Sequence, residues 1–270
     1  MSNFLENSLV LRIISGIAIA VPSIAAIHFG MPYFNILIAL LGMVMAWEWS
    51  NLCLKEFKLP GILLCCFIGV TPFLVLIDVS LFESILFAPV MCAVLFAISP
   101  NKKGKLWFAL GALYLCVPIS AFMFLRTEAE IGVGIVFWIA FMVSATDTGG
   151  YFFGLTIGGP KLAPRISPKK TWAGLLGGML GAFIVGFVFS YILDWQAPWA
   201  ISTLSAGLAV VAQIGDLFES HIKRTFDAKD SSQIIPGHGG VLDRLDGMLS
   251  AGAAIAGLIL ATNGQILAWF

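Results

Sequence analysis

The chain has 270 residues, of which 59% are hydrophobic and only 11% are charged, and its formal net charge is zero. Soluble domains contain about 45–50% apolar and about 25% charged residues, so a fold of this length could not hide so much apolar surface from water. The composition excludes an ordinary soluble domain and predicts a multi-span membrane protein. The five cysteines are scattered in apolar stretches, without the paired spacing of a zinc site or a disulfide framework.

A helix needs about 20 mostly apolar residues to cross a bilayer. Nine segments approach this length, so we expect an all-α, polytopic transmembrane bundle whose first segment is an uncleaved span. The predicted spans are residues 10–29, 33–54, 60–77, 81–98, 106–125, 132–154, 172–193, 198–219 and 248–267. The third and fourth are short and are separated by little more than Asp78, so eight spans are the alternative.

The positive charges predict the orientation. Of the fifteen Lys and Arg residues, all but Arg126 fall on one predicted side of the membrane. Arg12 is at the start of the first span, and the others lie in the connections after spans two, four, six and eight. Because cytoplasmic loops carry an excess of Lys and Arg, we expect a cytoplasmic N-terminus and an external C-terminus. We expect the bacterial inner membrane as the location, since the chain is compact and carries no organellar or regulatory extension.

The polar motifs concentrate in the second half of the chain. We therefore expect residues 1–140 to form scaffold spans and residues 141–270 to form a catalytic region. Two polar stretches within that region, residues 158–172 and 219–247, are predicted cytoplasmic loops that contribute to the site.

Two aspartates lie where lipid is expected. Asp147 is in the sixth predicted span and Asp216 is near the cytoplasmic end of the eighth. An aspartate at the centre of a span costs about 2.5–3.5 kcal/mol on insertion scales, so such residues usually face a polar cavity. Asp216, Glu219 and Ser220 are three and four residues apart and share one helix face. The alternative is a structural ion-pair network with nearby Lys and Arg.

Three other residues in the spans allow more than one interpretation. Gly149 and Gly150 are expected to loosen or end the sixth helix and to let a ligand approach the backbone. Glu48, between two tryptophans in the second span, fits an interfacial anchor as well as a site residue. We leave Glu48 outside the predicted site.

The segment from Ser220 to Asp246 predicts the chemistry. Bases that can neutralise phosphoryl oxygens alternate there with acids that can hold magnesium. They are Lys223, Arg224, Lys229 and Arg244, and Asp227, Asp230, Asp243 and Asp246. The glycine-rich turn at residues 236–240 offers backbone N–H groups that could cradle phosphate. The alternative is a merely solvated loop of a transporter.

Residues 220–246 resemble the signature of the phosphatidate cytidylyltransferases, with Ser, Lys-Arg, Lys-Asp, Pro-x-His-Gly-Gly and Asp-Arg-x-Asp in order. Further stretches resemble that family upstream, in the same order: residues 147–151, 162–164, 167–172 and 215–216. The resemblance covers about 147–247, whereas the first 140 residues match only as hydrophobic spans. One departure is Ala173, where the family usually carries Glu or Gln.

The resemblance implies that CTP and phosphatidate react to give CDP-diacylglycerol and pyrophosphate, with two magnesium ions and room for a monovalent cation. It also implies a homodimer, and no nucleic-acid partner is expected. The predicted catalytic residues are Asp216, Asp243, Asp246, Lys223 and Arg224. The predicted metal ligands are Asp216 and Asp243, with Asp246 and Asp147 as further ligands or neighbours.

The predicted substrate-binding residues come from both polar loops. They are Ser167, Lys169, Lys170, Thr171, Ser220, Lys229, Asp230, His238, Gly239, Gly240 and Arg244. The loop that contains Lys169 and Lys170 could instead be a basic anchor on anionic lipid. The rival functions are another lipid-linked phosphotransferase and a secondary transporter, but transporters often show two similar halves, and this chain does not.

Overall fold

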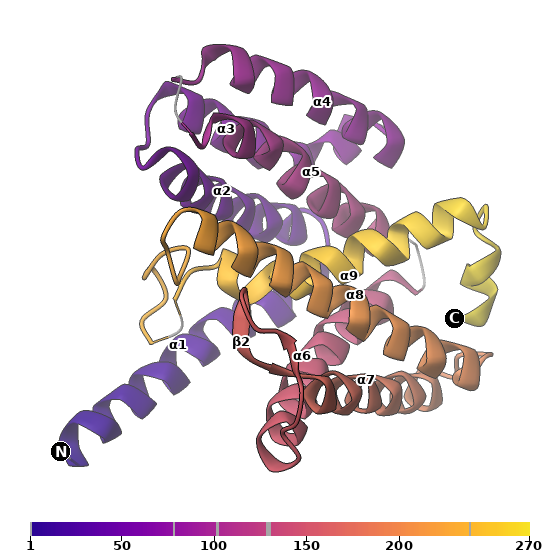
Figure 1. Cartoon of the computed structure of the whole chain (residues 1–270). Helices are drawn as coiled ribbons and strands as arrows, with labels where there is room; N and C mark the ends of the chain where they lie inside the picture. The colour runs from indigo at the N-terminus through magenta and orange to yellow at the C-terminus, as the bar shows by residue number, and fades with distance from the viewer. Residues whose placement is uncertain (1, 78, 101–102, 128–130, 238) are drawn as a thin grey trace. The chain divides into compact units, whose positions relative to one another are not determined.

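The structure is a computed structural model that describes residues 2–77, 79–100, 103–127, 131–237 and 239–270, with the backbone alone at 2–13, 81 and 82. Asp78, Lys102, Glu128, Glu130 and His238 lie outside the described residues. Within them, the chain forms helices and one small hairpin (Figure 1). The α-helices are α1 (Ser2–Phe29), α2 (Tyr33–Leu54), α3 (Leu59–Val70), α4 (Leu81–Ile98), α5 (Lys105–Thr127), α6 (Gly132–Thr156), α7 (Trp172–Ile192), α8 (Pro198–Thr225) and α9 (Leu242–Ala261).

The prediction of a polytopic helical membrane protein is confirmed. Seven helical segments of the described chain are long and apolar enough to cross a membrane, and two shorter apolar helices, Ile14–Phe29 and Glu83–Ile98, accompany them. The segment Leu59–Ile77 combines α3 with the 3-10 helix η1 (Thr71–Ile77). Pro72 explains this change of helix type, because proline has no N–H to donate to the preceding turn.

Two helices extend beyond the predicted spans into the polar stretch between them. α8 continues to Thr225, six residues past the predicted end, and its last turns carry Lys223 and Arg224. α9 begins at Leu242 and places Asp243 in its first turn. Hydropathy marks where apolar residues end, whereas a helix continues as long as its backbone groups and side chains find partners.

Contacts divide the chain into two compact units. The first comprises residues 1–123 and 225–245. In its core, α2 packs on α5 through Trp49, whose indole N–H donates to the Trp107 carbonyl oxygen at 3.0 Å. Gly111 allows this approach, because a Cβ there would lie 2.2 Å from the Trp49 nitrogen.

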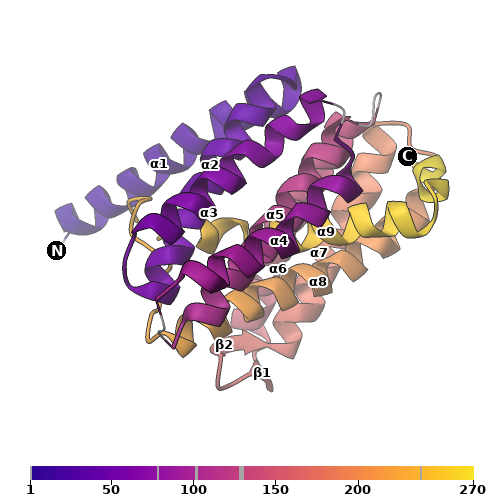
Figure 2. The same cartoon turned by 90° about the horizontal axis from the view of Figure 1, so that it is seen from above.

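The second unit comprises residues 124–224 and 246–270. Its α6 and α7 are joined by the antiparallel hairpin of β1 (Lys161–Ala163) and β2 (Ser167–Thr171) (Figure 2). α8 and α9 lie side by side (Figures 1 and 2), and the short 3-10 helix η2 (Gln265–Trp269) follows α9. The predicted division into scaffold spans at residues 1–140 and a catalytic region at residues 141–270 concerns function, and it stays a prediction.

Glycines bring α6 and α7 into backbone contact. A Cβ on Gly149 would lie 2.5 Å from the Gly177 carbonyl oxygen, and one on Gly178 would lie 2.8 Å from the Thr146 carbonyl oxygen. The expectation that Gly149 and Gly150 end or loosen the sixth helix is wrong, because α6 continues to Thr156. The two residues lack side chains to admit a neighbouring helix, as small residues do in membrane helix pairs.

Candidate active site

Three carboxylates from two helices gather within the second unit. Asp216 and Glu219 belong to α8 and Asp246 belongs to α9, and one oxygen of each lies within 4.8 Å of the others. Glu219 is fully buried and Asp246 is 9% exposed, whereas Asp216 is partly accessible. Such a group of oxygen ligands could hold a divalent cation.

The close packing of α8 on α9 brings these carboxylates together. Gly215 immediately precedes Asp216, and a Cβ on it would lie 2.0 Å from the Ser250 hydroxyl and 3.0 Å from the Asp246 carbonyl oxygen. A larger residue at this position would therefore force the helices apart. The cluster contains Asp216 and Asp246 but not Asp243, which was predicted as the second primary ligand.

Two lysines and a serine surround the acids. Lys170 of β2 forms an ion pair with Asp216, and Lys223 pairs with Glu219 at 2.8 Å, one helical turn along α8. The Ser220 hydroxyl donates to Asp216 at 3.3 Å. Carboxylates within 4.8 Å of one another repel, and the two lysines offset that repulsion.

The hairpin is anchored where it delivers Lys170. The Thr171 hydroxyl accepts a hydrogen bond from the Gly174 N–H at 3.0 Å and so caps the start of α7. The Trp172 N–H donates to the Pro160 carbonyl oxygen at 3.1 Å. Thr171 is buried, Ser167 is half-buried and Lys169 is exposed. Among these neighbouring predicted residues, Lys170 is the one that pairs with an acid of the cluster.

Asp243 organises the polar loop of the first unit. Its carboxylate accepts hydrogen bonds from the Ser231 N–H at 2.9 Å, the Ser231 hydroxyl at 3.0 Å and the Gly240 N–H at 2.8 Å. The Gly239 N–H donates to the Ile235 carbonyl oxygen at 3.2 Å. In this structure protein oxygens thus accept from both of these glycine N–H groups, and the role of the turn in binding phosphate stays a prediction.

Glu48 is a buried residue that the predicted site omitted. Its carboxylate accepts hydrogen bonds from the backbone N–H groups of Val241 and Leu242, at the start of α9. Nothing in the local sequence of α2 indicates this partnership, because the partners lie more than 190 residues away. Its position between two tryptophans pointed as well to the membrane interface.

The remaining predicted residues lie at or near the surface. Asp147, on α6, is exposed and is not among the three clustered carboxylates. The exposed members of the polar segment are Arg224, Lys229, Asp230 and Arg244. Their assigned roles remain predictions, and His238 lies outside the described residues.

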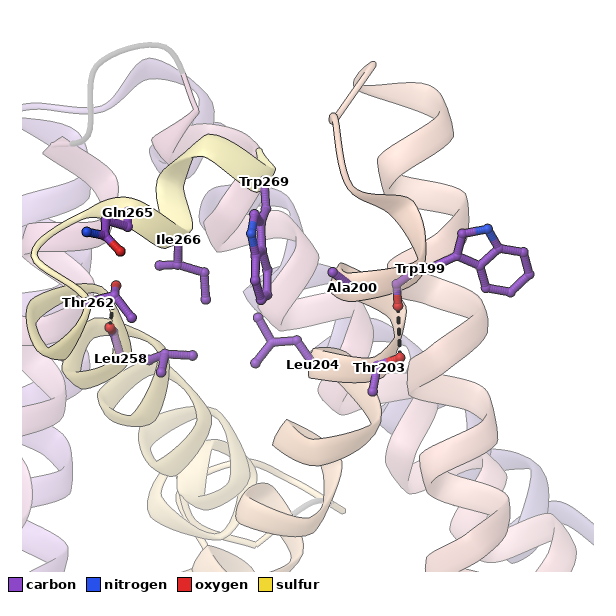
Figure 3. A pocket seen from close by; sticks show the side chains of 9 residues that line it. All are labelled: Trp199, Ala200, Thr203, Leu204, Leu258, Thr262, Gln265, Ile266 and Trp269. Carbon is purple, nitrogen blue, oxygen red and sulfur yellow. Dashed lines mark hydrogen bonds between the residues drawn. The ribbon is translucent and has the colours of Figure 1, made fainter.

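An apolar cavity of about 710 Å³ lies elsewhere in the second unit (Figure 3). Trp199 and Leu204 of α8 line it together with Leu258 of α9 and Trp269 of η2. Trp199 precedes Asp216 by 17 residues in one helix, which corresponds to about 25 Å at a rise of 1.5 Å per residue. This cavity is therefore separate from the carboxylate cluster.

The helices and the buried acids define a polytopic membrane protein with a polar centre suited to a divalent cation. The chain belongs to the cytidylyltransferase family, whose sequence pattern matches residues 10–261. It is 34% identical over 250 residues to the phosphatidate cytidylyltransferase of Brucella suis, covering 92% of each chain. It is 32% identical over 251 residues to that of Bacillus subtilis, covering 88% of this chain and 93% of the relative.

A third relative extends the comparison to another bacterial group. The phosphatidate cytidylyltransferase of Haemophilus influenzae is 31% identical over 272 aligned residues, which cover 89% of this chain and 94% of the relative. The similarity thus includes the N-terminal spans, which sequence motifs alone did not connect with a family.

Proposed function

We propose that this protein is a phosphatidate cytidylyltransferase, which transfers the cytidylyl group of CTP to phosphatidate and releases pyrophosphate. Family membership and near full-length similarity to enzymes of that name support the assignment. The observation that carries it is the cluster of Asp216, Glu219 and Asp246 on two adjacent apolar helices. A site of this kind places phosphate chemistry where a lipid substrate resides.

The residues present fit a magnesium site. Three carboxylates provide hard oxygen ligands, and magnesium binds through a few carboxylates together with substrate phosphates. The chemistry that magnesium supplies when bound is neutralisation of charge on phosphoryl oxygens. We assign Asp216, Glu219 and Asp246 to this role. Asp243 remains a predicted ligand beside Asp216, and Asp147 remains a predicted further ligand or neighbour. A second divalent ion and a monovalent cation also remain predictions.

The reaction needs positioning and charge neutralisation more than a strong base. A phosphate monoester has a second pKa near 6, so the phosphatidate oxygen is already an anionic nucleophile at neutral pH. It forms a bond to the α-phosphorus of CTP, and the bond from that phosphorus to the oxygen that bridges to the β-phosphate breaks. The electron pair leaves on pyrophosphate.

The cations of the chain have a direct part in this chemistry. Lys170 and Lys223 lie beside the carboxylates and would stabilise negative charge on the reacting phosphates. Arg224, Lys229 and Arg244 would bind the triphosphate and the lipid head group. Ser220 would keep the Asp216 carboxylate oriented through its hydroxyl.

The other predicted substrate residues complete the two polar loops. Ser167, Lys169 and Thr171 would close the site from the hairpin side, with Thr171 acting through the cap on α7. Asp230, His238, Gly239 and Gly240 remain predicted substrate-binding residues of the second loop. The homodimer rests on the resemblance and remains a prediction.

The location of the substrates fixes where the reaction must occur. Phosphatidate is held in the bilayer by two acyl chains, whereas CTP arrives from water. We propose a bacterial cytoplasmic membrane location with the site on the cytoplasmic side, in agreement with the Lys and Arg distribution. Each of the two polar loops then has access to the nucleotide.

The test uses purified protein in detergent–lipid micelles with phosphatidate, Mg²⁺ and CTP labelled in the cytidine. We expect the label to appear in the organic phase and pyrophosphate to appear in equal amount. CDP as the co-product would instead indicate a CTP-dependent lipid kinase. Solute uptake by proteoliposomes without CTP consumption would favour a transporter.

A further inference from the structure

Glu48 is a fully buried carboxylate near the end of α2. A buried carboxylate is costly unless hydrogen bonds compensate for the water that it loses. Its hydrogen-bond donors among the described residues are Ser232, Val241 and Leu242. All three lie in the segment 225–245, which belongs to the same compact unit as α2. This residue therefore joins an apolar span to a polar loop.

The carboxylate holds both ends of an eleven-residue stretch, residues 232–242. Oε1 accepts hydrogen bonds from the Ser232 hydroxyl at 2.5 Å and from the Val241 N–H at 2.9 Å. Oε2 accepts from the Leu242 N–H at 2.8 Å. The two backbone donors are at the start of α9, where N–H groups have no partner within the helix and a negative charge is favourable.

A second carboxylate closes the same stretch from the α9 side. Asp243 accepts from the backbone and hydroxyl of Ser231 and from the Gly240 N–H. The two carboxylates meet at Gly240, where a Cβ would lie 1.9 Å from the Ser231 hydroxyl and 2.5 Å from Glu48 Oε1. A side chain at residue 240 would therefore displace the Ser231 hydroxyl or the Glu48 carboxylate.

We propose that Glu48 is a positioning residue for the transferase, an inference that rests on the proposed function. It fixes the start of α9 and the loop that ends there, and through them Asp243 and Arg244. Glu48 need not touch a substrate to do this. Groups that bind a transition state must be held in place by their supporting contacts, and loss of such a contact typically costs about 10–100-fold in activity or metal affinity.

Glu48→Gln is the sharpest substitution, because it keeps the shape of the side chain. An amide has one acceptor oxygen and a donor NH₂ group. Since both carboxylate oxygens accept from backbone N–H groups, the amide must set a donor against one of them. Ser232→Ala removes a hydroxyl that donates to Glu48 and accepts from the Ile234 N–H, and it leaves both backbone bonds to Glu48 in place. Glu56→Gln is the matched control, because Glu56 lies just after α2 and pairs with the exposed Lys58.

The experiment measures kcat and KM for CTP in the full-length protein, with the thermal midpoint of each variant in the same detergent. For Glu48→Gln we expect kcat/KM for CTP to fall by at least about tenfold, with a higher KM. Ser232→Ala should give a smaller change in the same direction, and Glu56→Gln should match the wild type. Amide hydrogen exchange should accelerate at residues 231–243 in Glu48→Gln while exchange in α5 is unchanged.

A merely structural role would lower kcat through loss of active protein, at an unchanged KM and with a lower thermal midpoint. That result would overturn the inference, and so would a kcat/KM for CTP in Glu48→Gln within twofold of that of the wild type. Absence of labelled lipid product from the wild-type protein would instead overturn the proposed function, so the two failures are distinct.

Discussion

Lys170, on the hairpin strand β2, forms an ion pair with Asp216, on α8. The two paired residues are 46 positions apart in the sequence, so the contact joins distant parts of the chain. It connects the first polar loop with the carboxylate cluster inside one compact unit. The hairpin is therefore part of the candidate site, as well as a connection between α6 and α7.

Replacing Lys170 tests whether this contact serves the reaction. We expect Lys170→Gln to lower kcat/KM for CTP by about tenfold or more, because a charge that balances Asp216 and faces the phosphates is lost. Steady-state kinetics with labelled CTP measure the effect. Lys161→Gln is the control, since Lys161 is an exposed residue of β1 in the same hairpin. Equal losses in both variants would point to general attraction of CTP by the hairpin.

Each of the three clustered carboxylates should be essential. We expect Asp216→Asn, Glu219→Gln and Asp246→Asn to lower turnover by about a hundredfold or more, because each removes a charged oxygen ligand while keeping the side-chain shape. Turnover is measured over a range of Mg²⁺ concentrations. A ligand role predicts that a higher Mg²⁺ concentration partly restores at least one variant.

The matched control for the carboxylates is Asp227→Asn. Asp227 is exposed and has φ of 54°, a conformation that asparagine adopts as readily as aspartate. Activity of this variant should equal that of the wild type. If Glu219→Gln were also fully active, Glu219 would be a structural partner of Lys223 and the cation site would consist of the two aspartates.

The spans could be predicted from the sequence because lipid imposes a length and a composition on each of them. The meeting of Asp216 with Asp246 depends on the packing of α8 on α9, which the spacing of residues within either helix does not determine. The hairpin at residues 161–171 could not be foreseen, because its strands are short and carry no alternating pattern. Glu219 shared a helix face with Asp216, but its inclusion in the cluster depends on how α9 packs.

The partners of Glu48 illustrate the limit of local reasoning. A glutamate between two tryptophans fits a membrane interface, and its actual partners depend on a loop far away in the chain. The continuation of α6 through Gly149 and Gly150 likewise depends on a part of the chain outside the local sequence, because α7 packs against these residues. Intrinsic propensity disfavours two glycines in a helix, whereas close packing of α6 on α7 requires that Gly149 carry no side chain.

Gly149 offers a stability test of this packing. We expect Gly149→Ala to lower the free energy of unfolding by about 1–3 kcal/mol, because the new methyl group would lie 2.5 Å from the Gly177 carbonyl oxygen and must push α7 away. Thermal unfolding in detergent, followed by tryptophan fluorescence or circular dichroism, measures the shift. The midpoint should fall by several degrees.

Gly207→Ala is the matched control for this substitution. Gly207 lies inside α8, and a Cβ there would have no neighbour within 4 Å. Replacing glycine by alanine in open space within a helix stabilises by roughly 0.5–1 kcal/mol, so its midpoint should stay constant or rise. If Gly149→Ala unfolded at the same temperature as Gly207→Ala, α6 and α7 would be too far apart for backbone contact, and the hairpin between them would need another anchor to bring Lys170 to Asp216.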